Sequence, residues 1–159
     1  MPDLAPAVSP HLRRADPEDA PAVAELFWRV RSESVPSIPM MVHPRASVDP
    51  FVRDVLLQHF EVWVAEEDGR LVGFMALMPP GVLGHLYIAT AHTGQGLGRR
   101  FVAVAKRRFP EGLELWTFES NARAVRFYER HGFARVERTD GDNEEAAPDV
   151  RMVWRPQHP

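Results

Sequence analysis

The sequence predicts a single domain of the α/β (α+β) class. Three observations predict it. The chain has 159 residues, which fits one domain. Segments whose apolar residues alternate with polar ones are interleaved with segments whose apolar residues recur every third or fourth position. One predicted strand, at 81–90, leads through a glycine-rich turn into a helix. We place the domain at residues 11–155 and a flexible tail with three prolines at residues 1–10.

The first half is predicted to contain one short strand and two helices. The first helix has Asp16 as a cap and Pro17 in its first turn, and Ala22, Leu26 and Val30 follow at helical spacing. The next segment contains several prolines and no period, which predicts a loop. The predicted ranges are a strand at 11–16, a helix at 17–34, a loop at 35–50 and a helix at 50–60.

The second half alternates strands with helices. The clearest element is a hairpin, because Val62 and Val64 alternate with Trp63 and Ala65 before the turn "EDGR". Gly132 stands where a helix is expected to end in a left-handed residue. The predicted ranges are a hairpin at 61–79, strands at 81–90, 113–118, 133–139 and 149–155, helices at 98–109 and 121–132, and an acidic loop at 140–148.

The composition argues against several classes of function. The formal net charge of −3 argues against a nucleic-acid partner, which usually requires a basic face. No apolar run is long enough to span a membrane, so we expect no membrane partner. The sequence has no cysteine, hence no thiolate nucleophile, and its histidines are too scattered to predict a metal site. The lack of cysteine is compatible with a cytoplasmic location.

The stretch "TGQGLGRR", at 93–100, holds three glycines in five positions between a predicted strand and a predicted helix. The start of a helix carries unpaired N–H groups and a partial positive charge, and both attract anions. Glycines let such a backbone approach a phosphate closely. The spacing is neither that of a Walker A loop nor G-x-G-x-x-G. The stretch predicts an anion site, and the alternative is a glycine turn that binds nothing.

Two blocks of sequence resemble the GNAT acetyltransferases, the Gcn5-related N-acetyltransferase superfamily. The first is "LYIATAHTGQGLGRRFVAVAKRR", in which residues 93–98 correspond to the family's pyrophosphate loop, Gln/Arg-x-x-Gly-x-Gly/Ala. Thr93 stands at its first position, and Thr90 stands where many members have proline. The second block is "NARAVRFYERHGF", which closely matches Asn-x-x-Ala-x-x-Phe-Tyr-Glu-x-x-Gly-Phe. The resemblance covers about residues 11–155.

The resemblance implies a mixed, mostly antiparallel sheet flanked by helices and splayed between its fourth and fifth strands, where the pantetheine arm of acetyl-CoA enters. It implies direct transfer of an acetyl group from acetyl-CoA to an amine. The backbone N–H of Ile88 would stabilise the oxyanion, and Tyr128 would be the general acid. The implied site residues are Tyr128 and His85 for catalysis, and Ile88, Thr93, Gly94, Gly96, Gly98, Arg99 and Asn121 for cofactor binding.

Each catalytic role has a structural alternative. Tyr128 also fits a core position on an amphipathic helix, and Asn121 also fits a helix cap. His85 has a suitable pKa for the base that deprotonates the amine, but a hydrogen-bonded structural histidine is equally compatible with its place on a strand. Glu33, Glu119 and a chain of water molecules are further candidates for the base.

The acceptor is less constrained by the sequence. The resemblance implies a pocket built from the first two helices, their apolar loop at 35–50 and the last hairpin. The loop of that hairpin carries or borders five carboxylates, at Asp140, Asp142, Glu144, Glu145 and Asp149. Carboxylates near a pocket attract a cationic amine, so we expect a polyamine-like or aminoglycoside-like small molecule. The alternatives are a solvated loop without this role, a protein acetyltransferase acting on an N-terminus or a lysine, and a non-catalytic acyl-CoA-binding module. The sequence also allows a homodimer.

Overall fold

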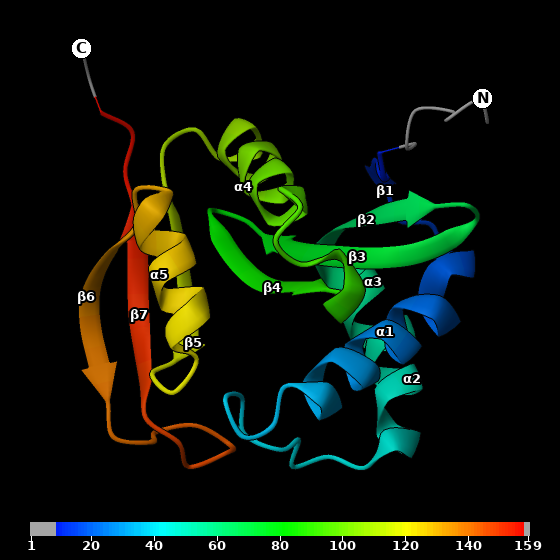
Figure 1. Cartoon of the computed structure of the whole chain (residues 1–159), viewed down its shortest axis with the longest axis horizontal. Helices are drawn as coiled ribbons and strands as arrows, with labels where there is room; N and C mark the ends of the chain where they lie inside the picture. Colours follow the sequence, from blue (N-terminus) through cyan, green and yellow to red (C-terminus); the bar gives the residue numbers. More distant parts are fainter. Residues whose placement is uncertain (1–8, 158–159) are drawn as a thin grey trace, which may run out of the picture.

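The computed structural model describes residues 9–157 and contains a seven-stranded sheet in the order β1-β2-β3-β4-β5-β7-β6 (Figure 1). The strands are β1 (His11–Arg14), β2 (Glu61–Glu67), β3 (Arg70–Met78), β4 (Val82–Ile88), β5 (Leu113–Phe118), β6 (Ala134–Thr139) and β7 (Asp149–Trp154). The helices are α1 (Ala20–Glu33), α2 (Val48–Phe51), α3 (Leu57–His59), α4 (Leu97–Arg108) and α5 (Ala122–Arg130). Single turns of 3-10 helix lie at Pro17–Asp19, Arg45–Ser47 and Thr90–His92, and a π-helical turn joins α2 to α3 at Val52–Leu56.

The sheet is antiparallel except where β4 meets β5. These two strands run parallel, and their register contains one pair, Val82 with Glu114, near the start of both strands. Beyond that pair the strands diverge, whereas β5 and β7 pair along their whole length. The predicted mixed sheet, with its splay between the fourth and fifth strands, is confirmed.

Helices cover both faces of the sheet. On one face the Phe27 ring of α1 packs edge-on against Phe74 of β3, with ring centroids 6.0 Å apart. On the other face the neighbouring residue of β3, Gly73, lies against Phe101 of α4. Figure 1 shows α5 lying along β5 and β7, on the far side of the splay from β4. The buried side chains of both faces belong to one hydrophobic cluster, which extends from α1 to β7.

The segment predicted as a loop over 35–50 differs from the prediction at its end. Residues 45–47 form a helical turn and α2 begins at Val48, so Pro50 lies inside the helix and does not mark its boundary. Proline is tolerated in the first turn of a helix because no intrahelical partner awaits its missing N–H there. The remaining part, residues 35–44, contains turns and bends but no helix or strand.

The tail predicted over residues 1–10 lies, as far as residue 8, outside the described residues. Within residues 9–157, no helix has both the length and the apolar character that crossing a membrane requires.

Candidate active site

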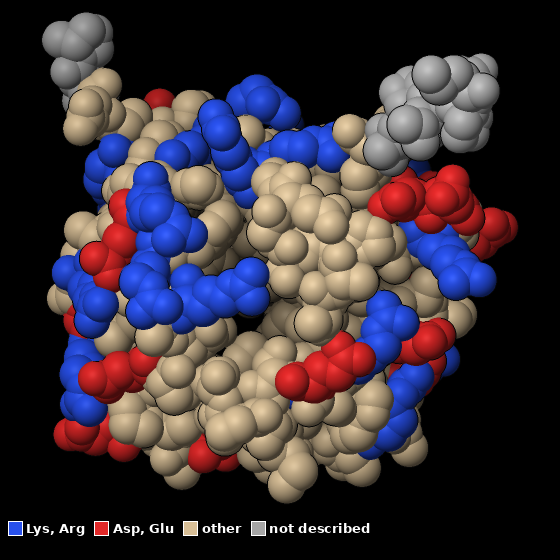
Figure 2. All heavy atoms as spheres, in the orientation of Figure 1, with Lys and Arg blue, Asp and Glu red and all other residues tan. Residues whose placement is uncertain are grey.

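The splayed strands open into a cleft of about 870 Å³. Its walls are β4 and β5, and the glycine turn, the start of α4 and the inner face of α5 complete it. Figure 2 shows a hollow in the middle of this face, with Lys and Arg side chains along one side. All nine residues that the sequence predicted for catalysis and cofactor binding line the cleft, and Glu33 lines it too.

The three glycines of the turn do two different things. Gly94 and Gly96 have φ values of 76° and 84°, a backbone conformation that side chains with a Cβ rarely adopt. Gly96 is the N-cap of α4, so this left-handed turn aims the first N–H groups of the helix toward the cleft. Gly98 is already helical, and a Cβ there would lie 3.1 Å from the Phe127 ring. Its role is to let α4 approach α5 closely.

Two threonines near the turn use their hydroxyls within the protein. Thr93 donates its hydroxyl to the carbonyl of Thr90 at 2.9 Å, which holds the turn together. Thr90 donates to a carboxylate oxygen of Glu33 at 2.6 Å and so ties the end of β4 to the end of α1. In this conformation the hydroxyl proton of Thr93 is not free for a phosphate, which leaves anion binding in the turn to the backbone N–H groups.

The backbone of β4 presents Ile88 to the cleft. Ala89 donates its N–H to Val72 of β3 at 2.9 Å, and the pair next to it in the register is Ile88 with Gly73. Hydrogen-bonded and non-hydrogen-bonded pairs alternate along an antiparallel ladder, so the N–H of Ile88 points away from β3. It points toward β5, and β5 has diverged at this level. A donor is thus aimed into the cleft, as an oxyanion hole requires.

Tyr128 is held on α5 by a small aromatic cluster. Its ring packs edge-on against Phe127 and Phe133, with centroids 5.1 Å and 5.4 Å away. The residue is 7% exposed and lines the cleft. Burial raises the pKa of Tyr128 well above that of a free phenol, and the nearby Tyr87 adds to the rise. Tyr128 is therefore protonated at neutral pH and can act as a hydrogen-bond donor.

Asn121 and a group of arginines mark the other side of the cleft. Asn121 caps α5, since its side-chain oxygen accepts the N–H of Ala124 at 3.3 Å. Arg99, Arg123 and Arg130 line the cleft, and none of the three forms an ion pair with another residue in the range 9–157. Guanidinium groups without carboxylate partners are well suited to phosphate.

A second cavity of about 380 Å³, which we call the chamber, adjoins the cleft. It lies beneath residues 41–43 and against α1 and α2. Its lining residues are Phe27, Arg31, Met41, Val42, His43, Ser47, Val48, Phe51, His85, Glu144 and Glu145. Two of these, His85 and Glu145, also line the cleft, so the two cavities meet between them.

His85 stands among aromatic rings. Phe27, Phe51, Phe60 and Tyr87 all have ring centroids within 6.1 Å of its own. Burial, with a smaller contribution from the charge of Arg31, lowers the pKa of His85 from 6.5 to about 4. The imidazole is therefore neutral at physiological pH. Of the other candidate bases, Glu119 is paired with Arg138 at 2.7 Å and does not line either cavity.

Sequence reasoning missed Arg31. It is only 7% exposed, its guanidinium lies 3.6 Å from Glu145, and it donates to the carbonyl of Pro39 at 3.1 Å. Arg31 comes four residues after Phe27 and eight after Val23, so it falls on the buried face of α1. A charged residue within that apolar stripe was the signal that could have found it. Its guanidinium lines the chamber and lies beside Glu145, which lines both cavities.

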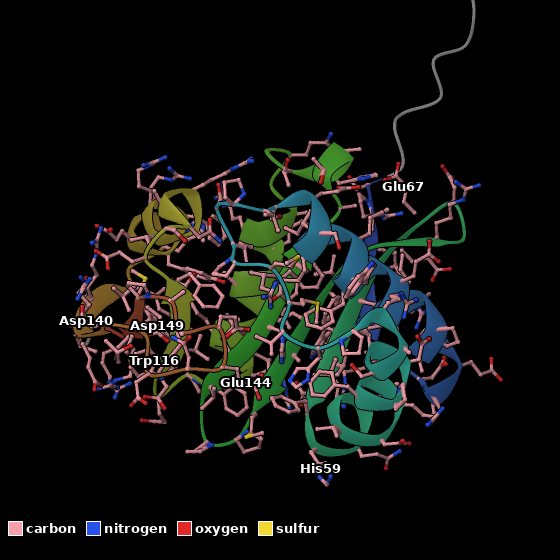
Figure 3. All side chains as sticks on the ribbon, turned by 90° about the horizontal axis from the view of Figure 1, so that it is seen from below. His59, Glu67, Trp116, Asp140, Glu144 and Asp149 are labelled. Atoms are coloured by element: carbon pink, nitrogen blue, oxygen red, sulfur yellow. The ribbon has the colours of Figure 1, made fainter. Side chains whose placement is uncertain are left out.

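Most carboxylates of the last hairpin are occupied by partners inside the protein. Glu144 contacts His43 at 3.0 Å, Asp140 pairs with Arg138, and the buried Asp149 accepts from Thr139. Figure 3 shows Glu144 apart from Asp140 and Asp149, which lie where the hairpin loop leaves β6 and enters β7. The acidic group therefore does not act as one negative patch. Of the five carboxylates, Glu144 and Glu145 are the ones that line the chamber.

Three side-chain contacts hold the loop over residues 35–44 in place. Ser120 donates its hydroxyl to the carbonyl of Ser37 at 2.7 Å, and the Glu144 contact holds His43. Together with the hydrogen bond from Arg31 to the carbonyl of Pro39, these contacts join the loop to α1, to the segment before α5 and to the loop of the last hairpin. Within residues 9–157, no group of three His, Asp or Glu side chains is placed to hold a metal ion.

Comparison with known proteins agrees with this geometry. A family model described as an acetyltransferase (GNAT) domain matches residues 58–135. The chain is 30% identical over 143 residues to the peptidyl-lysine N-acetyltransferase YiaC of Escherichia coli, an alignment that covers 90% of this chain and 95% of that protein.

Solved structures share the fold. PaiA N-acetyltransferase from Thermoplasma acidophilum, in complex with coenzyme A, superposes with a TM-score of 0.72 at 19% identity, over 94% of this chain and 100% of that one. A putative acetyltransferase of Salmonella typhimurium, yncA, with its cofactor acetyl-CoA, gives a TM-score of 0.71 at 18% identity, over 96% and 97% of the two chains.

Proposed function

Because the chain belongs to the GNAT acetyltransferase family, we propose that it transfers the acetyl group of acetyl-CoA to the primary amine of a small molecule. The observation that carries this proposal is the meeting of two cavities at His85 and Glu145. The larger one suits an extended thioester, and the smaller one suits the acceptor. Their junction is where the amine would meet the thioester carbonyl.

In the proposed reaction the cleft holds acetyl-CoA. The N–H groups at the start of α4 and the left-handed turn at Gly94 and Gly96 bind the pyrophosphate, and Arg99 adds charge. Asn121 also lines the cleft and would contact the pantetheine arm. The thioester carbonyl would then lie by Ile88, whose N–H would donate to the carbonyl oxygen and stabilise the negative charge that develops there.

The amine nitrogen attacks the carbonyl carbon directly. A C–N bond forms, the oxyanion collapses, and the C–S bond breaks with release of the thiolate of CoA. Tyr128 donates a hydrogen bond or its proton to that sulfur. No covalent acetyl-enzyme is part of the proposal, and the sequence contains no cysteine that could form one through sulfur.

An alkyl ammonium has a pKa near 10 and must lose its proton before it attacks. That first proton goes to solvent, and His85 is the proposed acceptor of the second proton, which the nitrogen loses after it has attacked; the neutral imidazole leaves a ring nitrogen free to accept it. Because the pKa of His85 is about 4, full transfer from the ammonium costs about 8 kcal/mol. His85 is therefore assigned the second proton alone, which leaves the more acidic nitrogen of the tetrahedral intermediate.

The size and closure of the chamber support a small acceptor. At about 380 Å³ it lies near the lower end of the range for small-molecule sites, and the loop over residues 35–44 lies across it. The expected polyamine-like or aminoglycoside-like acceptor was based on the acidic hairpin. That argument now depends on Glu144 and Glu145 alone, since Asp140 and Asp149 are engaged elsewhere and Asp142 lines neither cavity.

A protein acceptor is the second candidate. The relative from Escherichia coli, at 30% identity, is named a peptidyl-lysine N-acetyltransferase, and a lysine side chain is narrow enough to enter the chamber. A lysine would reach the junction from the rim near His43, with its peptide outside. An N-terminal amine would bring the peptide backbone itself into the chamber and fits it less well.

The test is release of free thiol from acetyl-CoA, measured over a panel of simple amines, polyamines, aminoglycosides, amino acids and lysine peptides. Release with free amines is the expected result. Release with lysine peptides alone would overturn the small-molecule acceptor and support the second candidate. Tight binding of acetyl-CoA in calorimetry with no release for any amine would support a non-catalytic acyl-CoA-binding module.

A further inference from the structure

The chamber has a polar end and an apolar end, and this contrast bears on what it binds. We propose that the acceptor is an amine with a single ammonium group, held by Glu145 at the junction, and an apolar tail, aromatic or aliphatic, that fills the chamber. This inference rests on the proposed small-molecule acetyl transfer. It replaces a polyamine by a monoamine of the alkylamine or arylalkylamine class.

The wall of the chamber is mainly apolar. Phe27, Val48 and Phe51 come from α1 and α2, and Met41 comes from the loop above them. Ser47 also lines the chamber, but its hydroxyl already donates to the carbonyl of Pro44 at 2.7 Å. His85 contributes a neutral ring. Such a wall favours a ligand that buries carbon, and the only carboxylate besides Glu145 that its described residues offer to a second ammonium is the solvated Glu144.

Glu145 is placed to receive the ammonium. It is one of the two residues that line both cavities, so an ammonium beside it lies next to the thioester site. Its carboxylate is 16% exposed and 3.6 Å from Arg31, which is too far for a hydrogen bond. Neither of its oxygens accepts a hydrogen bond from another side chain in the described part of the chain. The carboxylate therefore keeps its acceptor capacity for a ligand.

The positive charge of Arg31 favours an acceptor with one ammonium group over an acceptor with several. Its guanidinium is buried and lines the chamber, and its Nε has no hydrogen-bond partner among residues 9–157. A polyamine anchored at Glu145 would place its next ammonium inside the chamber, against this fixed positive charge and the phenylalanine rings. Repulsion of that kind selects against a ligand as effectively as attraction selects for one.

Glu144, by contrast, lies at the rim. Its side chain is 68% exposed and its partner His43 is 57% exposed, so the pair is well solvated. A cation there gains little, because charges in contact with water are screened. Its contribution does not offset the cost of a second ammonium deeper inside.

The first test compares matched amines. Butylamine and 1,4-diaminobutane, or hexylamine and 1,6-diaminohexane, differ by one ammonium at constant length. We expect the monoamine to have at least a tenfold higher kcat/KM. Along ethylamine, butylamine and hexylamine, kcat/KM should rise by about fourfold for each methylene that becomes buried. Diamines as good as or better than monoamines would overturn the inference and leave the proposed small-molecule transfer intact.

The second test uses two adjacent methionines. Met41→Trp fills the chamber and should lower kcat/KM for hexylamine and phenethylamine about tenfold, with the KM for acetyl-CoA unchanged. Met40→Trp is the matched control, because Met40 is 75% exposed and does not line the chamber. Equal effects of both variants, or none from Met41→Trp, would show that no acceptor tail occupies the chamber.

A third variant tests the anchor. Glu145→Gln should raise the KM for the monoamine about tenfold and leave acetyl-CoA binding unchanged in calorimetry. Retention of the fold is checked by circular dichroism, because the change leaves Arg31 without its ion-pair partner. An unchanged amine KM would remove Glu145 from the inference. Acetylation of lysine peptides with no turnover of any free amine would overturn the proposed function and this inference together.

Discussion

Lowering the pH should lower the free energy of unfolding, because His85 has a lower pKa in the folded protein than in the unfolded chain. In the unfolded chain the imidazole has a pKa of 6.5, and its burial in the folded protein lowers that pKa to about 4. Between these values the unfolded state binds a proton that the folded state does not. Stability from this group is therefore complete above pH 6.5 and is lost as the pH falls toward 4. The difference corresponds to about 3 kcal/mol in all, and to about 2 kcal/mol by pH 5.

The assay is urea unfolding at pH 7.5 and pH 5.0, for the parent and for His85→Leu. Other groups titrate over the same range, but they are common to both proteins. The loss of unfolding free energy between the two pH values should be about 2 kcal/mol larger in the parent. Leucine has a similar volume and suits the surrounding rings, so the variant is expected to fold.

Equal losses in the two proteins would refute the reasoning. They would mean that the imidazole is solvated well enough through the chamber to keep an ordinary pKa. In that case His85 would also be a far better base than its surroundings indicate, and the activity profile would show a limb near pH 6.5.

Three further outcomes follow from the cleft. Tyr128→Phe keeps the packed ring and removes the donor, so kcat should fall about 10²-fold at an unchanged KM for acetyl-CoA in steady-state kinetics; an unchanged kcat would exclude the hydroxyl. Gly98→Ala presses a methyl group against Phe127, so urea unfolding should show a loss of about 1–2 kcal/mol; full stability would contradict the close approach of α4 to α5. Arg123→Ser should raise the KM for acetyl-CoA about fivefold at low salt and less at high salt, while Arg126→Ser, on the same helix but outside the cleft, should not.

The order of helices and strands could be predicted from the sequence because it is local information. The alternation of Val62 and Val64 with their neighbours, the cap at Asn121 and the left-handed Gly132 each specify one element or one end. The main difference, Pro50 inside α2, also has a local cause. A proline marks a boundary and fits a first turn equally well, and the pattern alone does not choose between them.

The chemistry of the acceptor side could not be predicted in the same way. The carboxylates of the last hairpin are visible as a run of acidic residues, but their partners are far away in the chain. Glu145 meets Arg31 and Glu144 meets His43, each across more than 100 residues. A sequence shows how many carboxylates a segment has but not which distant residues pair with them. Only the fold shows which carboxylates remain free to accept hydrogen bonds from a ligand.

The arrangement of the two cavities also bears on the order of events. The donor enters between β4 and β5, the acceptor enters beneath the loop over residues 35–44, and the two spaces meet at His85 and Glu145. Direct attack needs both cavities filled at once, so reciprocal plots of initial rate at several fixed amine concentrations should give intersecting lines. Parallel lines would reveal an acetylated enzyme that survives release of CoA. That result would contradict direct attack, because it would require a nucleophilic side chain in the cleft, and the proposed mechanism assigns none.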